Sequence, residues 1–143
     1  MTDKTGKPWM AAGETDDPNS LIESYEAEGA ITKGSPVELT NDGKVSATAT
    51  TWYGFGIAVK SAVDGEQVPI LRRGRVKVVA NGALTAAGVA VRNGGNGKVT
   101  ELNDQAIDES GEASYTIYMS RKLGKALQKA DADGDLIFIE AGA

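Results

Sequence analysis

The chain has 143 residues, of which 41% are hydrophobic and 24% are charged, and its net charge at pH 7 is −5. The length suits one domain, or two small halves that share a core, and the acidic balance argues against nucleic acid as the main partner. Because the sequence contains neither Cys nor His, it excludes disulfides, thiolate nucleophiles, imidazole catalysis and zinc sites built from those residues.

Residues 1–20 are polar and rich in turn-forming residues, and they show no hydrophobic periodicity. We therefore predict a flexible N-terminal arm that can be deleted without loss of the fold. The arm contains Lys7, Pro8, Trp9 and Met10. Two large apolar residues in such an arm suit a docking anchor for a partner, and the alternative is that they fold back onto their own domain. The N-terminus lacks the apolar segment of a secretory signal, so we expect a protein made in a cytosol.

Residues 21–143 are predicted to form one β domain, because short apolar or β-branched runs alternate with Gly, Asn and Asp. The turn at residues 41–43 (Asn-Asp-Gly) predicts a hairpin, since Asp-Gly tolerates the positive φ of a tight turn. No apolar run reaches the roughly 20 residues of a membrane span, so we expect no membrane partner. Residues 121–130 fit a helix by the spacing of their apolar residues, or a strand by the internal repeat. The predicted strands are 37–39, 44–46, 56–59, 67–71, 75–79, 115–119 and, as a buried strand, 136–139.

Trp52, Tyr53 and Phe55 form the densest aromatic cluster of the chain. We predict that Phe55 belongs to the core, while Trp52 and Tyr53 pack at its rim, where they can contact a partner. The alternative role of such a cluster is to stack against a sugar.

The chain contains an internal duplication. Both halves follow the pattern Gly-Ala-apolar-Thr, then Asx-Gly-Lys-Val, then apolar-Gly-x-Ala, then Gly-acid-x-apolar-x-apolar, and they span about 29–79 and 82–139. A lone hairpin is marginal in water, so two units that bury each other's valines are predicted to form a small barrel or sandwich. The second half has an extra segment, roughly Glu101 to Ala113, which we interpret as an exposed loop.

Two motifs resemble ligand-binding loops but miss the required spacing. Residues 131–135 (Asp-Ala-Asp-Gly-Asp) lack the Gly and the Glu at the positions that a calcium loop needs, so we interpret them as an acidic turn. Residues 92–99 lack the first Gly and the final Ser or Thr of a phosphate-binding loop. The carboxylates are scattered over turns, and no pair is placed for acid–base work. We therefore predict no catalytic residue, no metal and no cofactor.

The glycine-punctuated runs Gly-Ala-Ile-Thr-Lys-Gly-Ser-Pro-Val, Asp-Gly-Lys-Val, Gly-Phe-Gly-Ile-Ala-Val, Gly-Glu-Gln-Val-Pro-Ile and Arg-Gly-Arg-Val-Lys-Val resemble the capsid-decoration (cement) proteins of tailed phages. The resemblance covers about Tyr25 to Ile139. It is to the small β-tulip-like cement proteins and, more distantly, to lambda-type head-decoration proteins.

This resemblance implies a homotrimer, synthesised in the host cytoplasm, on the outer capsid surface of the virion. The trimer would sit at local three-fold points, bind the major capsid protein, bridge neighbouring capsomers and stabilise the shell. The resemblance carries no catalytic residues over to this chain. The residues expected to contact the capsid or another subunit are Lys7, Pro8, Trp9, Met10, Trp52 and Tyr53.

Three other functions stay open at this stage. A carbohydrate-binding or adhesin-like β module on a virion would need an exposed, concave aromatic patch around Trp52 and Tyr53. An enzyme domain would need a cleft with paired carboxylates of shifted pKa. An accessory domain of a larger assembly, such as a tail component, is the third. Under the decoration hypothesis, deletion of residues 1–20 is expected to leave the fold intact and to weaken attachment to the shell.

Overall fold

The fold is built from short β-strands, as the turn-rich sequence predicts. A computed structural model describes residues 2–102, 105–109, 112–116 and 119–143. Over these residues the only helical element is a single 3₁₀ turn, η1 (Met119–Arg121), and no helix is long and apolar enough to cross a membrane. The all-β prediction is therefore confirmed. The strands are β1 (Leu21–Glu26), β2 (Pro36–Leu39), β3 (Val45–Ser46), β4 (Gly56–Ala58), β5 (Gln67–Val79), β6 (Ala90–Gly95), β7 (Lys98–Glu101), β8 (Gln105–Glu109), β9 (Glu112–Thr116), β10 (Lys122–Ala126) and β11 (Leu136–Ala141).

Nine of these strands form one antiparallel sheet in the order β3-β2-β4-β5-β11-β10-β6-β7, with β1 added to β5. The two ends of this order, β3 and β7, do not pair with each other, so the sheet stays open and the predicted barrel closure is wrong. Each end instead bridges back within its own half of the chain, through the pairs Ala27–Val45 and Ala80–Val99. These local bridges use the edges that closure of the whole sheet would need.

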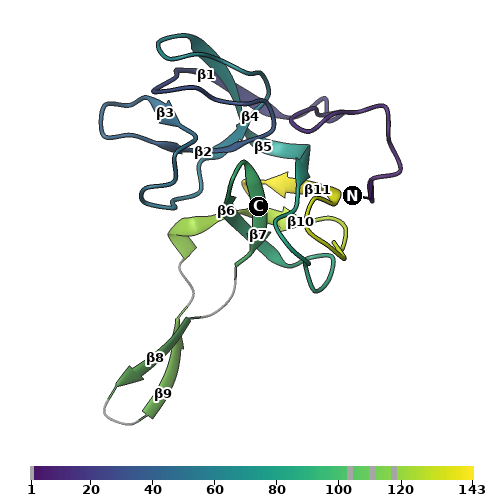
Figure 1. Cartoon of the computed structure of the whole chain (residues 1–143), viewed down its shortest axis with the longest axis vertical. Helices are drawn as coiled ribbons and strands as arrows, with labels where there is room; N and C mark the ends of the chain where they lie inside the picture. Colours follow the sequence, from purple (N-terminus) through teal and green to yellow (C-terminus); the bar gives the residue numbers. More distant parts are fainter. Residues whose placement is uncertain (1, 103–104, 110–111, 117–118) are drawn as a thin grey trace.

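Strand β5 connects the two halves of the molecule (Figure 1). Its first half pairs with β1 and β4, and its second half pairs with β11. The change of partners falls at Gly74, whose φ of +123° bends the strand. We call β1–β4 with Gln67–Arg73 the first unit, and Gly74–Val79 with β6, β7, β10 and β11 the second unit. The boundary thus lies inside β5, whereas the predicted repeat placed all of residues 75–79 in the first half.

The two units repeat the same backbone hydrogen bonds at matched positions. In each unit the Gly-Ala-apolar-Thr segment donates one N–H group, and the Gly that follows it donates a second. The acceptors are the last residue of the apolar-Gly-x-Ala motif and the residue four positions after it. The bonds in the first unit are Ile31 to Ala62 at 2.9 Å and Gly34 to Ala58 at 2.8 Å; in the second unit they are Leu84 to Ala130 at 2.9 Å and Gly88 to Ala126 at 2.7 Å. The duplication seen in the sequence is therefore a duplication of strand pairing.

Each unit buries its own apolar side chains, and β5 contributes to both cores. Val68 and Ile70 enter the first core, whereas Leu71, Val76 and Val78 enter the second. The second core therefore continues into the first unit and holds the two together. The first core also contains Ala27, Ile31, Val37, Val45, Ala58 and Ala62, and the second also contains Ile57, Ala80, Leu84, Val91, Val99, Leu123, Ala126, Ala130, Ile137, Ile139 and Ala141.

The extra segment of the second unit lies between β7 and β10. Strands β8 and β9 pair there as a separate two-stranded sheet, which lies apart from the main sheet at the bottom of Figure 1. Among the described residues of the predicted loop Glu101–Ala113, the structure therefore has strand β8 and the start of β9 in place of a loop. Of residues 121–130, which fitted either a helix or a strand, residues 122–126 form strand β10, as the repeat indicates, and none forms an α-helix. Residues 117–118 of the predicted strand 115–119 lie outside the described residues, and β11 confirms the buried strand 136–139.

Candidate functional site

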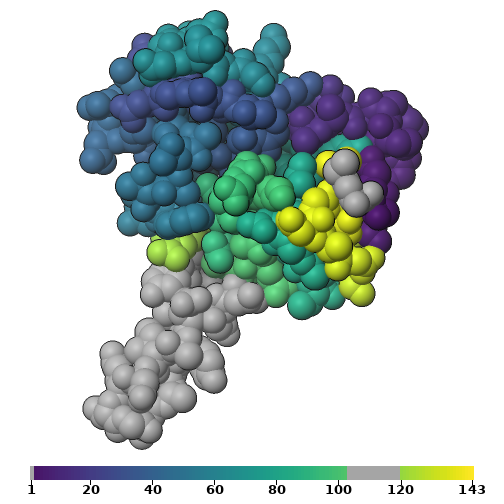
Figure 2. Space-filling view, in the orientation of Figure 1, coloured from purple at the N-terminus to yellow at the C-terminus, as the bar shows by residue number. Residues whose placement is uncertain are grey.

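Residues 2–20, which we call the N-terminal segment, are bound along β5 and β11, where the sequence predicts a flexible arm. Figure 2 shows this purple segment against the body of the protein, next to the yellow C-terminal residues. Gly13 N–H donates to the carbonyl of Lys77 at 2.7 Å, and Lys77 N–H donates to the carbonyl of Glu14 at 3.0 Å. Leu136 exchanges similar bonds with Thr2 and Lys4, each at 2.8 Å. Residues 13 and 14 thus extend the outer edge of β5, whereas residues 2–4 bind the start of β11.

A buried cation fixes this segment to the sheet. The Lys77 side chain has no exposed surface, and its ammonium group donates to the Asp3 carboxylate and to the carbonyl groups of Lys7 and Met10, at 3.0 and 2.8 Å. Burial alone raises the pKa of Asp3, but hydrogen bonds from Lys77 and Thr5 outweigh it and lower the pKa. Because a buried ammonium group needs such partners, removal of residues 1–20 is now expected to destabilise the fold.

The predicted contact residue Lys7 is engaged within its own chain. Its ammonium group and the Arg75 guanidinium both bind the Asp16 carboxylate, with 2.7 Å between Arg75 Nη2 and Asp16 Oδ1. The hydrogen bond from Lys7, followed by that from Arg75, lowers the pKa of Asp16 to about 2. Lys7 therefore shapes the N-terminal segment, while the neighbouring Pro8 is exposed.

The structure separates Trp9 from Met10. The Met10 side chain is 9% exposed, whereas that of Trp9 is 75% exposed. Both line a shallow groove of about 340 Å³, together with the apolar side chains of Ile22 and Val59. We call this feature the Trp9 groove. Of the two alternatives for this pair, Met10 folds onto its own domain and Trp9 faces solvent. The rest of the groove is lined by Gly13, Glu14, Thr15 and Asp16.

A buried carboxylate positions the loop that carries Trp52. Glu38 is buried, and its carboxylate accepts the backbone N–H groups of Thr50, Thr51 and Trp52 at 2.8, 3.1 and 3.0 Å. These bonds hold Trp52 at a φ of +65°, which a bulky residue rarely adopts. The loop is therefore fixed from inside the protein.

The aromatic residues of this loop do not form a concave platform. Trp52 is half-buried, and a Cβ added at Gly95 would lie 3.7 Å from its Cη2, so its ring lies beside the end of β6. Tyr53 is 56% exposed, and neither residue lines the Trp9 groove. Phe55 packs on the first core, as predicted, with the Arg72 guanidinium 3.8 Å above its ring centre. The arrangement suits contact with a flat partner more than enclosure of a sugar.

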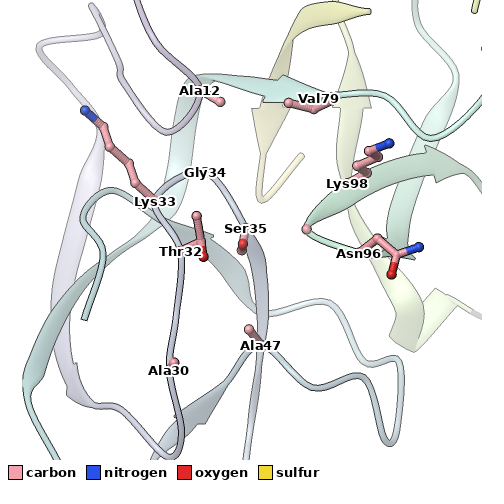
Figure 3. Close-up of a pocket in the computed structure, with 11 residues that line it drawn as sticks. Ala12, Ala30, Thr32, Lys33, Gly34, Ser35, Ala47, Val79, Asn96 and Lys98 are labelled. Atoms are coloured by element: carbon pink, nitrogen blue, oxygen red, sulfur yellow. The ribbon is translucent and has the colours of Figure 1, made fainter. Parts of the chain in front are cut away.

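A cavity of about 380 Å³ lies between the two units. Figure 3 shows Thr32, Lys33 and Ser35 on one side and Asn96 and Lys98 on the other. The two ammonium groups that could attract an anion are already paired, Lys33 with Glu14 at 2.7 Å and Lys98 with Asp133 at 3.1 Å. The residues that line the cavity include no carboxylate, so it offers no acid–base pair.

The acidic turn at residues 131–135 is filled by the protein's own donors. The Asp135 carboxylate accepts the N–H groups of Asp131 at 2.9 Å, Ala132 at 3.2 Å and Thr2 at 3.1 Å. These bonds, that from Asp131 above all, lower the pKa of Asp135. Asp131 pairs with Lys4. Within the described ranges, no group of three or more acidic side chains could hold a metal ion, and the turn instead ties the N-terminus to β11.

Sequence reasoning missed three side chains that shape the candidate surface: Lys77, Glu38 and Asp16. Lys77 stands between Val76 and Val78 in an alternating strand, a pattern that predicts a solvated lysine. Glu38 stands between Val37 and Leu39 in the same way. The role of each of these charged side chains depends on the groups that it binds elsewhere in the chain. No local signal in the sequence marks them.

Known proteins resemble this chain in fold and in sequence pattern. The head fiber gp8.5 N base of bacteriophage phi29 has a similar fold, with a TM-score of 0.56 and 16% sequence identity over 86% of this chain and 94% of that chain. No curated protein matches the sequence. The model of the phage cement protein family matches residues 18–141, which is nearly the whole β domain. The chain therefore belongs to the phage cement protein family and is a structural protein of the phage capsid.

Proposed function

We propose that this chain decorates the outer surface of a phage capsid. In this proposal a homotrimer sits at a local three-fold point, binds the major capsid protein, and bridges neighbouring capsomers so that the shell resists internal pressure. The family match over residues 18–141 carries the proposal. A closed three-fold ring limits growth of the assembly, and three weak contacts on one lattice site add to a tight one, because the later contacts form at high effective concentration.

The exposed aromatic residues support a contact surface near the N-terminal segment and the Trp52 loop. Trp9 and Tyr53 are the aromatic side chains that the structure leaves most exposed among the described residues, and large aromatic residues dominate the energetics of many protein interfaces. In the proposal Pro8, Trp9, Trp52 and Tyr53 touch the capsid or a neighbouring subunit. Lys7 and Met10 hold the segment that presents Trp9.

The charge of the chain agrees with a position outside the shell. A net charge of −5 keeps the free protein soluble and disfavours binding to packaged DNA. In this proposal the chain is synthesised in the host cytoplasm, joins the virion, and performs no catalytic step. In this proposal the protein acts only by binding. A rigid fold with two connected cores and internally paired charges suits that role.

Light scattering and co-sedimentation with undecorated shells test the proposal. We expect a mass of about three times the 14.9 kDa of one chain, and we expect the protein to pellet with shells that lack it. Trp9→Ala should weaken shell binding at least about tenfold, as for an exposed aromatic hot spot. Val63→Ala is the control, because Val63 is also an exposed apolar residue but does not line the Trp9 groove. A stable monomer that stays in solution with the shells would refute the proposal.

A further inference from the structure

The outer edge of β1 has open backbone groups. Strand β1 pairs along one edge with β5, in a register that places Ser24 opposite Pro69. Proline has no N–H group, and the Pro69 carbonyl accepts the N–H of Val59 at 3.1 Å on its other side. The Ser24–Pro69 pair is therefore not hydrogen-bonded, and Ser24 directs its own N–H and carbonyl away from β5. Ile22, two residues earlier, faces the same way. In the described part of the chain no backbone group binds Ile22 or Ser24 on this side.

The duplication shows what the matching edge binds in the second unit. The register of β1 on β5 equals the register of β5 on β11, so Ser24 corresponds to Lys77 and Ile22 to Arg75. Residues 13–17 cover this second edge: Gly13 and Glu14 bind the backbone of Lys77, and the Thr15 hydroxyl donates to the carbonyl of Arg75. Asp17 accepts the N–H of Arg75 at 3.3 Å. Residues of the same chain thus cover the outer edge of β5 in the second unit, whereas the corresponding edge of β1 in the first unit stays open.

The edge of β1 also lacks the usual protection of an edge strand. Native sheets blunt exposed edges with short strands, proline or unpaired charges. The terminal strands β3 and β7 are short, and each bridges back to its own unit. Strand β1 has six residues and no proline or lysine. Its Glu23 and Glu26 are neutralised by Arg72 and Lys44, at 3.2 and 2.8 Å, and its Leu21 and Ile22 side chains are each 42% exposed.

We propose that the outer edge of β1 binds an extended segment of the capsid lattice protein as an added antiparallel strand. This inference rests on the proposed function and names its mode of attachment. Residues 13–17 are the template for the backbone pairing. In the template, Asp16 accepts a hydrogen bond from Arg75 at 2.8 Å. Ile22 takes the place of Arg75 in β1, beside the Trp9 groove. The residue of the added strand that faces Ile22 is therefore apolar. A second copy of β1 is the alternative occupant of this edge, and a change of oligomeric state in the Ser24→Pro variant would identify it.

Ser24→Pro is the direct test, with Ser24→Ala as the matched control. Proline removes the outward N–H and is tolerated on an edge strand when that N–H faces solvent. Alanine removes the hydroxyl and keeps the N–H. We expect Ser24→Pro to keep the wild-type circular dichroism spectrum and to bind undecorated shells about tenfold more weakly or worse, whereas Ser24→Ala binds as the wild type does. Ile22→Lys should weaken binding to a similar degree, because it places a charge where an apolar contact is expected.

Failure of this inference can be told apart from failure of the proposed function. If wild-type protein does not pellet with shells, the proposed function fails. If wild-type protein and a folded Ser24→Pro variant pellet equally, only the edge assignment is overturned. Should Ser24→Pro not fold, hydrogen exchange of the wild-type peptide that covers β1 decides: slower exchange on shell binding supports the inference, and unchanged exchange refutes it. Conversion of a wild-type oligomer to monomer by Ser24→Pro would assign the edge to a second copy and overturn the capsid partner.

Discussion

Lys77 shows how one side chain organises the first part of the chain. Its ammonium group lies inside the protein and gathers Asp3 and the carbonyl groups of Lys7 and Met10 around it. The extended N-terminal segment, which has no regular secondary structure of its own to hold it, gains a fixed path from this cation. Trp9 lies between two of the anchoring residues, Lys7 and Met10, so the position of the exposed indole depends on this buried interaction.

Asp3→Asn should lower the free energy of unfolding by about 1–3 kcal/mol, because it removes the carboxylate partner of a buried ammonium group. Lys77→Met in the Asp3→Asn background should recover part of this loss, since it removes the charge that was left unpaired. Urea denaturation measures both effects. Lys125→Met is the control: Lys125 is exposed, and a change within about 0.5 kcal/mol is expected there. Equal stability of Asp3→Asn and wild type would show that the cation does not anchor the segment.

Asp16 predicts a pH dependence. Its pKa of about 2 in the folded protein lies below the value of about 3.9 for an unperturbed Asp. The stabilisation from its ion pairs is therefore complete above pH ~4 and is lost as the pH falls through ~2. The melting temperature of the wild type should fall in this window, and that of Asp16→Asn should fall less. The variant should be the less stable protein at pH 7, and the two should converge near pH 2. Parallel melting curves at all pH values would contradict this account.

At the scale of single residues, the sequence predicts the roles of those residues whose surroundings are set by their neighbours in the chain. Phe55 packs on the first core, as its place beside an apolar strand predicts, and residues 131–135 form the turn that their Asp and Gly residues predict. Lys77 and Glu38 are not recognisable, because the segments that bury them lie distant in the sequence or in an irregular loop. For the same reason the sequence gives no basis to distinguish Trp9 from Met10, whereas in the structure Trp9 is exposed and Met10 is buried.

At the scale of elements, Gly56 and Gly124 show that the repeat is one of close packing as well as of pattern. They occupy equivalent places in β4 and β10, in the repeated apolar-Gly-x-Ala motif. A Cβ at Gly56 would lie 2.7 Å from the carbonyl oxygen of Leu71, and one at Gly124 would lie 2.1 Å from that of Glu140. Both distances are far below a normal contact. Each unit therefore uses glycine to bring two strands together.

Gly124→Ala and Gly56→Ala should each destabilise the protein by about 3 kcal/mol or more, because the added methyl group would overlap a backbone oxygen that cannot move alone. Gly94→Ala in β6 is the comparison. Its Cβ would meet Asn81 and Thr100 at 3.1–3.2 Å, an overlap that a shift of a few tenths of an ångström relieves, so the cost should be smaller. Thermal or chemical unfolding measures the series. A larger loss for Gly94→Ala than for Gly124→Ala would contradict the packing argument.

The strand pattern of the sequence predicts most elements but not their grouping. Alternation and Asx-Gly turns locate β2, β3 and β11, and the repeat correctly favours a strand over residues 122–126. The boundary between the units escapes detection because β5 is continuous, and no turn residue other than Gly74 marks the change of partners. Strand β8 and the first part of β9 escape prediction because their segment has no counterpart in the first half of the chain, so the repeat gives no information there.

At the scale of the whole molecule, the sequence predicts two units around shared cores but not an open sheet. Closure would require β3 and β7 to meet, and each strand is already bridged to the chain just after β1 or β5. Such bridges join residues about 18–19 apart in the sequence, and a short loop costs less entropy to close than a long one. Local closure within each unit therefore replaces closure of the whole.

Deletion of residues 105–116, with a two-glycine closure, should leave the main fold and its melting temperature nearly unchanged, within about 3 °C for a loss below ~0.5 kcal/mol. The reason is that β8 and β9 form a sheet separate from the nine-stranded one, and the first unit links its corresponding strands without such an insertion. Differential scanning calorimetry measures the effect. A large loss of stability would show that this hairpin supports the main sheet.

The continuity of β5 also has a mechanical consequence. One covalent strand passes through both units, and Ser20 of the returning N-terminal segment lies beside Gly74 at the point of passage, where an added Cβ would lie 2.9 Å from that of Ser20. Tension applied along this axis is therefore carried by peptide bonds and by hydrogen bonds loaded in shear, which break together rather than one after another.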